Sequence, residues 1–195
     1  MVYIILRALS FLIYKILFRF RAYGVENIPK KGAFILASNH VSYLDPIALG
    51  IATSRPLNYM ARHDLFFNPA FAWLLRQVRT FPLKRDTADL SAIKKALSFL
   101  DSGEPLVLFP EGSRRMEKVS DEPQPGIGFL AAKSGVPVIP ACIKGTDEAL
   151  PKGAKFIKPV KVTVHFGEQI LIERGMPYQD IAKLIMERVR HLSCN

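Results

Sequence analysis

Short apolar runs alternate along the chain with segments of helical periodicity, and this alternation constrains the fold more than any other feature of the sequence. Such alternation is typical of an α/β layer structure, in which helices cover a sheet. The apolar runs predict strands at residues 33–37, 57–61, 78–83, 105–109, 136–143 and 161–166. The helical segments predict helices at residues 47–52, 69–77, 89–100, 127–133 and 178–192. We therefore expect a central, mostly parallel or mixed sheet flanked by helices.

The length of 195 residues suits one hydrophobic core, and no linker or internal repeat divides the chain. With 27 Lys and Arg against 17 Asp and Glu, the net charge of +10 favours anionic partners, such as nucleic acid, anionic lipid or an acidic carrier protein. Cys142 and Cys194 show neither metal-ligand spacing nor a disulfide framework. These features predict a single domain in a reducing cytosol.

The first 20 residues are nearly all apolar, but Arg7, Lys15 and Arg19 interrupt them, which leaves no stretch long enough for an ordinary membrane-spanning helix. A helical projection separates a polar side from an apolar side. The polar side holds Tyr3, Arg7, Ser10, Tyr14, Lys15 and Arg21, and the apolar side holds Ile5, Leu9, Leu12, Ile16 and Phe20. We expect residues 1–22 to form an amphipathic anchor in the membrane surface, with its basic face on anionic headgroups, ahead of a domain at 23–195. A signal peptide and a core-packing helix are the alternatives.

A histidine and an aspartate follow directly on the first apolar run of the domain. His40 and Asp45 would lie about 140° apart on a regular helix, so they meet only if the chain turns between them. Pro46 favours that turn, with Asp45 as the N-cap of a helix and His40 on the incoming loop. The carboxylate could then accept the imidazole N–H and leave the other nitrogen to take a proton from an alcohol. Alone, the pair is equally consistent with a helix cap beside a space-filling histidine.

A second polar segment, Phe-Pro-Glu-Gly-Ser-Arg at residues 109–114, follows the apolar run at 105–109. Gly112 permits close backbone approach, Ser113 offers a hydroxyl, and Arg114 carries a planar fork that matches a phosphate. A surface loop with solvated arginines is the alternative interpretation. The basic pair Lys84–Arg85, at the end of the 78–83 run, has the same two interpretations.

Taken in order, these segments resemble the glycerolipid acyltransferase family, in particular bacterial 1-acyl-sn-glycerol-3-phosphate (lysophosphatidic acid) acyltransferases. The resemblance extends from about residue 23 to residue 167 and rests on four blocks, at residues 39–45, 81–85, 109–114 and 136–140. The second block departs from the family pattern, because Thr80 and Leu83 stand where members often have glycine and isoleucine or valine.

The resemblance implies a glycerol-phosphate acyltransferase-like fold with an acyl channel. It implies that His40 acts as general base on the acceptor hydroxyl, oriented by Asp45, without a covalent acyl-enzyme. Residues implied to bind or shape the acceptor site are Lys84, Arg85, Glu111, Gly112, Ser113 and Arg114. The implied acyl donor is acyl-CoA or acyl-carrier protein, and we expect neither a metal nor another cofactor.

The expected reaction moves a fatty acyl group to the sn-2 hydroxyl of lysophosphatidic acid, giving phosphatidic acid in phospholipid biosynthesis at the cytoplasmic face of the cell membrane. The expected partners are membrane phospholipids, lysophosphatidic acid and the acyl donor. Glycerol 3-phosphate or another lyso-lipid is an alternative acceptor, and a non-enzymatic basic lipid- or nucleic-acid-binding protein is an alternative class. We expect no nucleic-acid partner, because no aromatic stacking platform accompanies the basic residues.

Overall fold

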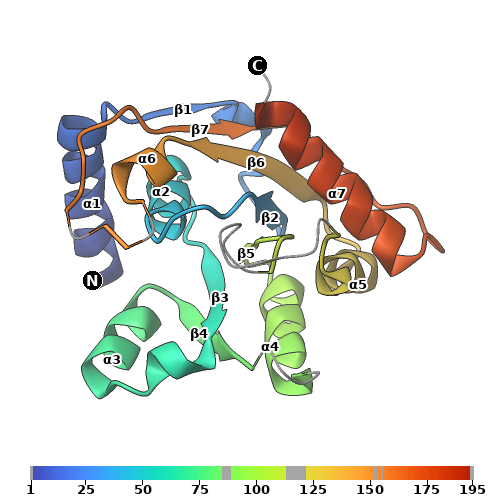
Figure 1. Cartoon of the computed structure of the whole chain (residues 1–195). Helices are drawn as coiled ribbons and strands as arrows, with labels where there is room; N and C mark the ends of the chain where they lie inside the picture. Colours follow the sequence, from blue (N-terminus) through green and yellow to red (C-terminus); the bar gives the residue numbers. More distant parts are fainter. Residues whose placement is uncertain (1, 85–88, 113–121, 152, 155, 194–195) are drawn as a thin grey trace.

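A seven-stranded sheet forms the centre of the protein, as seen in a computed structural model that describes residues 2–84, 89–112, 122–151, 153–154 and 156–193 (Figure 1). The strands are β1 (Arg21–Tyr23), β2 (Ile35–Ser38), β3 (Asn58–Arg62), β4 (Thr80–Leu83), β5 (Leu106–Leu108), β6 (Val138–Lys144) and β7 (Thr163–Phe166). Their order is β1-β7-β6-β2-β5-β3-β4. Neighbouring strands are parallel, except that β6 and β7 pair antiparallel. The predicted mixed α/β fold is confirmed.

Helices cover both faces of this sheet (Figure 1). They are α1 (Val2–Phe18), α2 (Asp45–Ala52), α3 (Pro69–Gln77), α4 (Leu90–Asp101), α5 (Pro125–Ser134), α6 (Thr146–Ala149) and α7 (Tyr178–Ser193), with 3₁₀ turns η1 (Val25–Asn27) and η2 (His63–Phe66). All six predicted strands and five predicted domain helices are found, with ends within two residues of expectation. The short elements β1 and α6 were not predicted from the sequence.

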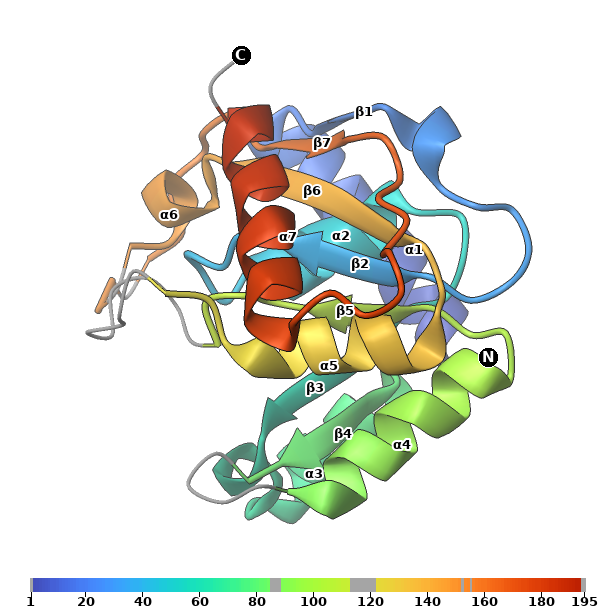
Figure 2. The ribbon, with the colours of Figure 1, turned by 90° about the vertical axis from the view of Figure 1, so that its right-hand side faces the viewer.

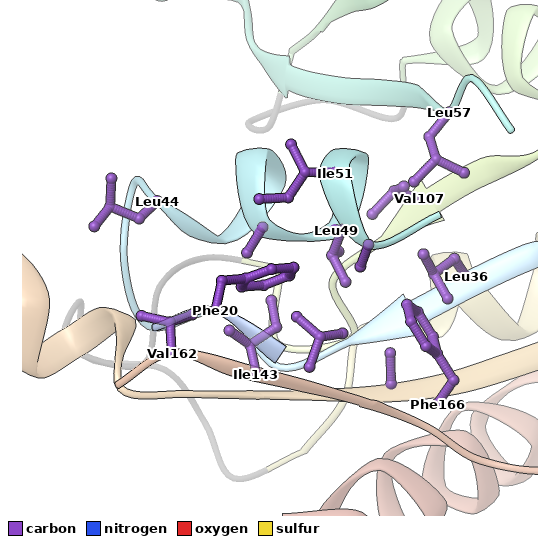
Figure 3. Close-up of a cluster of buried hydrophobic side chains, with 14 of the residues drawn as sticks. Phe20, Leu36, Leu44, Leu49, Ile51, Leu57, Val107, Ile143, Val162 and Phe166 are labelled. Carbon is purple, nitrogen blue, oxygen red and sulfur yellow. The ribbon is translucent and has the colours of Figure 1, made fainter. Parts of the chain in front are cut away.

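Two hydrophobic clusters lie on opposite faces of the sheet, because successive side chains of a strand point to opposite sides. Leu36 of β2 packs into the cluster beneath α1 and α2, together with Leu49 and Phe166 (Figure 3). Ile35 and Ala37 pack into the other cluster, beneath α4, α5 and α7 (Figure 2). β2 is therefore buried on both faces, as expected for a parallel strand inside an α/β sheet.

The carboxyl ends of five parallel strands, β6, β2, β5, β3 and β4, meet at one edge of the sheet. β2 is the central strand of the whole sheet, between β6 and β5. Ligands of open α/β sheets bind at this edge, where connections leave neighbouring strands in different directions. The loop from β2 to α2, which carries His40, begins at this position.

Helix α1 packs on the rest of the protein with its polar side. The Tyr14 side chain is buried, and the Arg7 guanidinium donates hydrogen bonds to the Thr53 and Ser54 carbonyls, just after the end of α2. A cation is favourable there, because the last carbonyls of a helix lack partners within the helix. For Arg7, the expected contact with anionic headgroups is therefore wrong.

Most of the predicted apolar side of α1 is correspondingly exposed, but the prediction is wrong for Phe20, which follows the helix and is buried in the core. The large exposed side chains of α1 are Ile4, Ile5, Leu9, Phe11, Leu12, Ile13 and Ile16. We call these seven residues the apolar face of α1. Among the residues that the structure describes, no helix is both long and apolar enough to cross a bilayer.

Candidate active site

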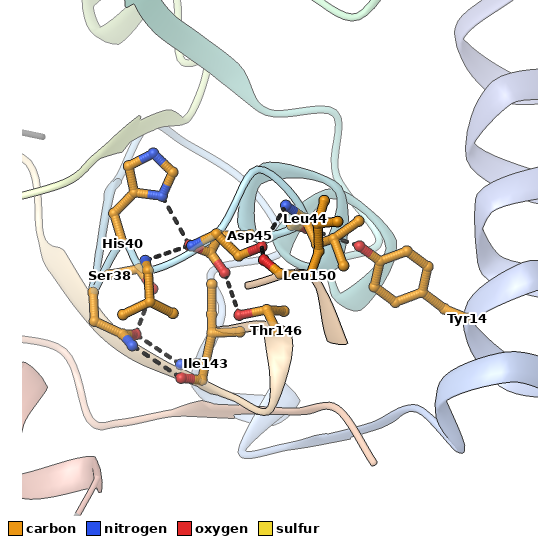
Figure 4. Close-up of polar contacts among 11 residues, drawn as sticks. Tyr14, Ser38, His40, Leu44, Asp45, Ile143, Thr146 and Leu150 are labelled. Carbon is orange, nitrogen blue, oxygen red and sulfur yellow. Dashed lines mark hydrogen bonds and ion pairs between the residues drawn. The ribbon is translucent and has the colours of Figure 1, made fainter. Parts of the chain in front are cut away.

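His40 and Asp45 meet beyond the carboxyl end of β2. The Nδ1 atom of His40 lies 2.8 Å from Oδ2 of Asp45, the first residue of α2 (Figure 4). The His40 side chain is 17% exposed, whereas the Asp45 side chain is completely buried. The predicted contact between the two residues is thus present, and part of the His40 side chain remains accessible.

The Asp45 carboxylate is surrounded by hydrogen-bond donors. The backbone N–H groups of Val41 and Ser42 each donate to Oδ2 at 2.7 Å. The Thr146 hydroxyl donates to Oδ1 at 2.5 Å. Hydrogen bonds of this kind stabilise the ionised form of a buried carboxylate, which would otherwise be expensive to bury.

Asp45 is not the N-cap of α2, so that part of the sequence-based prediction is wrong. A turn brings the Asp45 N–H onto the Ser42 carbonyl at 3.2 Å, and the first helical bond runs from the Ala48 N–H to the Leu44 carbonyl. Leu44 therefore occupies the N-cap position. The winding begins before Pro46, and the Asp45 side chain turns back towards the loop instead of capping the helix.

Two buried tyrosines hold the first turn of α2. The Tyr14 hydroxyl donates to the Leu44 carbonyl at 2.8 Å, and the Tyr59 hydroxyl donates to the Pro46 carbonyl at 3.0 Å. Burial raises the pKa of Tyr14, and the nearby Asp45 carboxylate raises it further. Burial also raises the pKa of Tyr59 well above its ordinary value. Both phenols therefore stay protonated and act as donors on either side of Asp45.

Asn39 fixes the other end of the loop. Its side-chain amide donates to the Ile143 carbonyl at 2.9 Å and accepts from the Ile143 N–H at 2.8 Å. These two bonds occupy the backbone N–H and C=O of Ile143, which would pair with β2 if that strand continued. The Asn39 side chain therefore extends the pairing of β2 with β6. The residue before His40 is thus anchored to the neighbouring strand.

The second polar segment reaches the same site through Phe109. The Phe109 ring stacks on the His40 imidazole, with centroids 4.1 Å apart and planes 20° from parallel. Glu111 and Gly112 follow within three residues, and Gly112 has a φ of 69°, which favours glycine. The start of the segment at 109–114 therefore lies beside His40.

Of the four remaining predicted site residues, the structure describes only Lys84. Lys84 follows β4 at the same edge of the sheet, with its side chain exposed and its N–H bonded to Asp89. Arg85, Ser113 and Arg114 lie outside the described residues. The expected phosphate contacts of Lys84, Arg85 and Arg114 stay predictions.

A small cavity of about 110 Å³ lies beside the loop, lined by residues that include Asn39, Glu111, Cys142, Lys144 and Met186. Pockets for drug-sized ligands usually have volumes of about 300 Å³ or more. The cavity is therefore too small to hold a whole lyso-lipid, and the expected acyl channel stays a prediction.

Comparison with known proteins identifies the family of the chain. A protein-family model described as Acyltransferase matches residues 19–144, more than half of the chain. The chain belongs to the acyltransferase family. The resemblance drawn from the four sequence blocks is thereby confirmed.

Similar proteins place this acyltransferase more narrowly within the family. A 1-acyl-sn-glycerol-3-phosphate acyltransferase of Bacillus subtilis (strain 168) is 29% identical over 151 residues, which cover 77% of this chain and 73% of the relative. An enzyme of the same name from Streptococcus pneumoniae (strain ATCC BAA-255 / R6) is 30% identical over 151 residues, covering 76% and 54%. The crystal structure of the 1-acyl-sn-glycerophosphate (LPA) acyltransferase PlsC from Thermotoga maritima matches with a TM-score of 0.76 and 27% identity, covering 97% of this chain and 78% of that chain.

Three residues that bond to the segment from His40 to Pro46 in this acyltransferase were missed or misassigned from the sequence. Thr146 is an isolated threonine that follows an apolar run. Tyr14 was placed on the polar side of a surface helix. Tyr59 lies within a strand and looks like an ordinary core residue. Only the fold brings these three together, so no local pattern could have identified them.

Proposed function

We propose that this acyltransferase moves a fatty acyl group from a thioester to the sn-2 hydroxyl of 1-acyl-glycerol 3-phosphate, giving phosphatidic acid for phospholipid biosynthesis. The 2.8 Å contact between His40 Nδ1 and Asp45 Oδ2 carries the proposal. An ionised carboxylate only accepts hydrogen bonds, so Nδ1 must be the donor and Nε2 keeps its lone pair. The names of the similar proteins support this choice of acceptor.

His40 acts as the general base in the proposed reaction. As the acceptor oxygen attacks the thioester carbonyl carbon, its proton passes to Nε2 of His40. The carbon–sulfur bond then breaks, and the proton passes from His40 to the departing thiolate. Asp45 keeps the ring oriented and stabilises the imidazolium between the two transfers. This mechanism needs no covalent acyl-enzyme.

Cationic side chains hold the acceptor's phosphate in this proposal. Lys84 is the described candidate, and Arg85 and Arg114 are the other two. Guanidinium groups bind phosphate with paired hydrogen bonds, whereas an ammonium group acts as a point charge. In this proposal Glu111, Gly112 and Ser113 shape the acceptor site.

The apolar face of α1 supports a peripheral or monotopic position on a membrane. The proposal places the protein at the cytoplasmic face of the cell membrane. Ile16 is 73% exposed and Ile4 is 69% exposed, although isoleucine is usually buried. Insertion of such a face into the headgroup region removes apolar surface from water. A lyso-lipid acceptor would then reach His40 without leaving the bilayer. The donor, acyl-CoA or acyl-carrier protein, is acidic and suits a chain of net charge +10.

The test uses the purified full chain with vesicles containing phosphatidylglycerol, with lysophosphatidic acid or glycerol 3-phosphate as acceptor. Each acceptor is paired with acyl-CoA and with acyl-carrier protein, and labelled products are separated by chromatography. We expect phosphatidic acid to form from lysophosphatidic acid with at least one donor. Transfer to glycerol 3-phosphate alone would contradict the proposed acceptor. No transfer to either, together with salt-sensitive binding to DNA, would contradict the proposed class of function.

A further inference from the structure

Thr146 approaches Asp45 from a side that His40 does not use (Figure 4). Three donors, from His40, Val41 and Ser42, converge on Oδ2, whereas Thr146 binds Oδ1. Both side chains in the Thr146–Asp45 contact are fully buried. A charge-assisted hydrogen bond therefore lies within the protein interior, where water cannot replace it.

The fold brings Thr146 to this position by a sharp turn after β6. Gly145 has a φ of 85°, and a Cβ atom there would lie 2.1 Å from the Lys161 carbonyl oxygen, so the turn requires glycine. The single helical turn α6 follows, held by the bond from the Leu150 N–H to the Thr146 carbonyl at 3.0 Å. The Leu150 carbonyl in turn accepts from the Ser42 hydroxyl at 3.3 Å. Helix α6 thus contacts the His40–Asp45 loop at two points.

We infer that Thr146 is a positioning residue for acyl transfer, which fixes the rotation of the Asp45 carboxylate so that Oδ2 faces His40. This inference rests on the proposed function. The terminal torsion of an aspartate has a broad energy profile, so the carboxylate rotates easily unless each oxygen has its own partner. Because the other three donors all converge on Oδ2, the Thr146 bond to Oδ1 sets the rotation of the carboxylate plane. With Thr146 in place, the Asp45 carboxylate has one orientation, and the bond from Nδ1 fixes the His40 ring so that Nε2 points away from Asp45.

The inference predicts a kinetic effect that differs from that of lost substrate binding. Replacing Thr146 by valine keeps the volume but removes the hydroxyl. We expect kcat to fall about 10- to 100-fold, the range expected when a buried hydrogen bond to an ionised group loses one partner. The KM for lysophosphatidic acid should stay within about twofold, because Thr146 touches no substrate in the proposed mechanism.

The experiment compares Thr146→Val and Thr146→Ala with Thr146→Ser, which restores the hydroxyl and should recover most of kcat. Thr53→Val is the matched control, because Thr53 is buried at the opposite end of α2 and its hydroxyl bonds a carbonyl, that of Arg55, at 3.0 Å. The downfield proton NMR signal of the His40 Nδ1–H gives a second readout, which we expect in wild type and in Thr146→Ser and expect to shift or broaden in Thr146→Val.

The outcomes separate this inference from the proposed function. An active wild type with an equally active Thr146→Val or Thr146→Ala would overturn the inference and leave the proposed function standing. A wild type without transfer to lysophosphatidic acid would overturn the function itself. If neither Thr146→Val nor Thr146→Ala folds, Thr146→Ser decides, because it keeps the hydroxyl. A folded Thr146→Ser that loses kcat about 10- to 100-fold with an unchanged His40 proton signal would refute the positioning role.

Discussion

The phenol of Tyr14 donates a hydrogen bond of 2.8 Å to the carbonyl of Leu44, the residue that precedes Asp45. This contact links helix α1 directly to the start of α2. At the other end of α2, Arg7 binds the carbonyls of Thr53 and Ser54. The helix with the exposed apolar face is therefore attached to both ends of the helix that carries the aspartate of the candidate site.

Tyr14→Phe should lower the free energy of unfolding by about 1 kcal/mol, because the Leu44 carbonyl loses a buried donor. Urea unfolding followed by circular dichroism measures the change. Tyr23→Phe is the matched control, because Tyr23 is 41% exposed. We expect the loss of its hydroxyl to leave stability unchanged. Equal stability of Tyr14→Phe and wild type would show that the contact contributes nothing to folding.

His40→Ala should reduce kcat by about 10² to 10⁴, the usual contribution of a general base. Folding should be retained, because His40 is part of a loop and its ring is partly exposed. Asp45→Asn should lose activity and also stability, because the amide has one acceptor oxygen instead of two and lacks the negative charge that strengthens the bonds from Val41, Ser42 and Thr146. Initial rates with varied acceptor, together with thermal unfolding, test both variants. Near-normal transfer by folded His40→Ala would exclude the proposed mechanism.

The double variant Leu9→Glu with Leu12→Glu should abolish binding to vesicles that contain anionic lipid. The two side chains are 53% and 56% exposed on the apolar face of α1, so glutamate is tolerated in water but not in the headgroup region. Vesicle co-sedimentation measures binding, with Leu171→Glu as control because Leu171 is 69% exposed on a different segment. Unchanged co-sedimentation of the double variant would contradict the proposed membrane contact.

Glu104→Gln should destabilise the protein slightly at neutral pH but not at acidic pH. Burial disfavours the charged form of Glu104, but hydrogen bonds from Arg79 and Asn58 outweigh it and hold the pKa of this carboxyl below its ordinary value. A carboxyl with a lowered pKa stabilises the fold above its ordinary pKa, and this contribution disappears as the pH falls through the lowered value. Because both charged side chains are about one-third exposed, we expect only about 0.5 kcal/mol at pH 7.

Urea titrations of wild type and Glu104→Gln at pH 7 and at pH 3 measure this difference. Glu26→Gln serves as the control, because no hydrogen bond or ion pair of the Glu26 side chain occurs within the described ranges, and its substitution should have no effect at either pH. A destabilisation that grows on acidification would contradict the assigned interaction.

Most of the sheet could be predicted from the sequence because buried parallel strands are continuous apolar runs. β1 could not, because Arg21–Tyr23 is short and polar and becomes a strand only by pairing with β7, far along the chain. The inward orientation of Arg7 could not be predicted either. It depends on the Thr53 and Ser54 carbonyls, whose position relative to α1 is set by packing of α1 on α2.

The core of the candidate site was more accessible to sequence reasoning than its surroundings. The contact between His40 and Asp45 followed from a turn at Pro46, although the turn in fact begins at Ser42. The stacking of Phe109 on His40 was not predicted, because the sequence places the two polar segments after separate apolar runs and only the sheet makes those strands neighbours. Thr146 and Tyr59 gave no signal, because a hydroxyl directed at Asp45 or Pro46 resembles any other buried hydroxyl in the sequence.

The position of β1 at the edge of the sheet has a consequence for synthesis on the ribosome. Among the described strands β1 pairs only with β7, so residues 21–23 emerge long before the strand that completes their place in the sheet. Until residues 163–166 have been translated, the apolar face of α1 belongs to an unfinished nascent chain. The sheet therefore closes at its β1–β7 edge only when the last of its seven strands has left the ribosome.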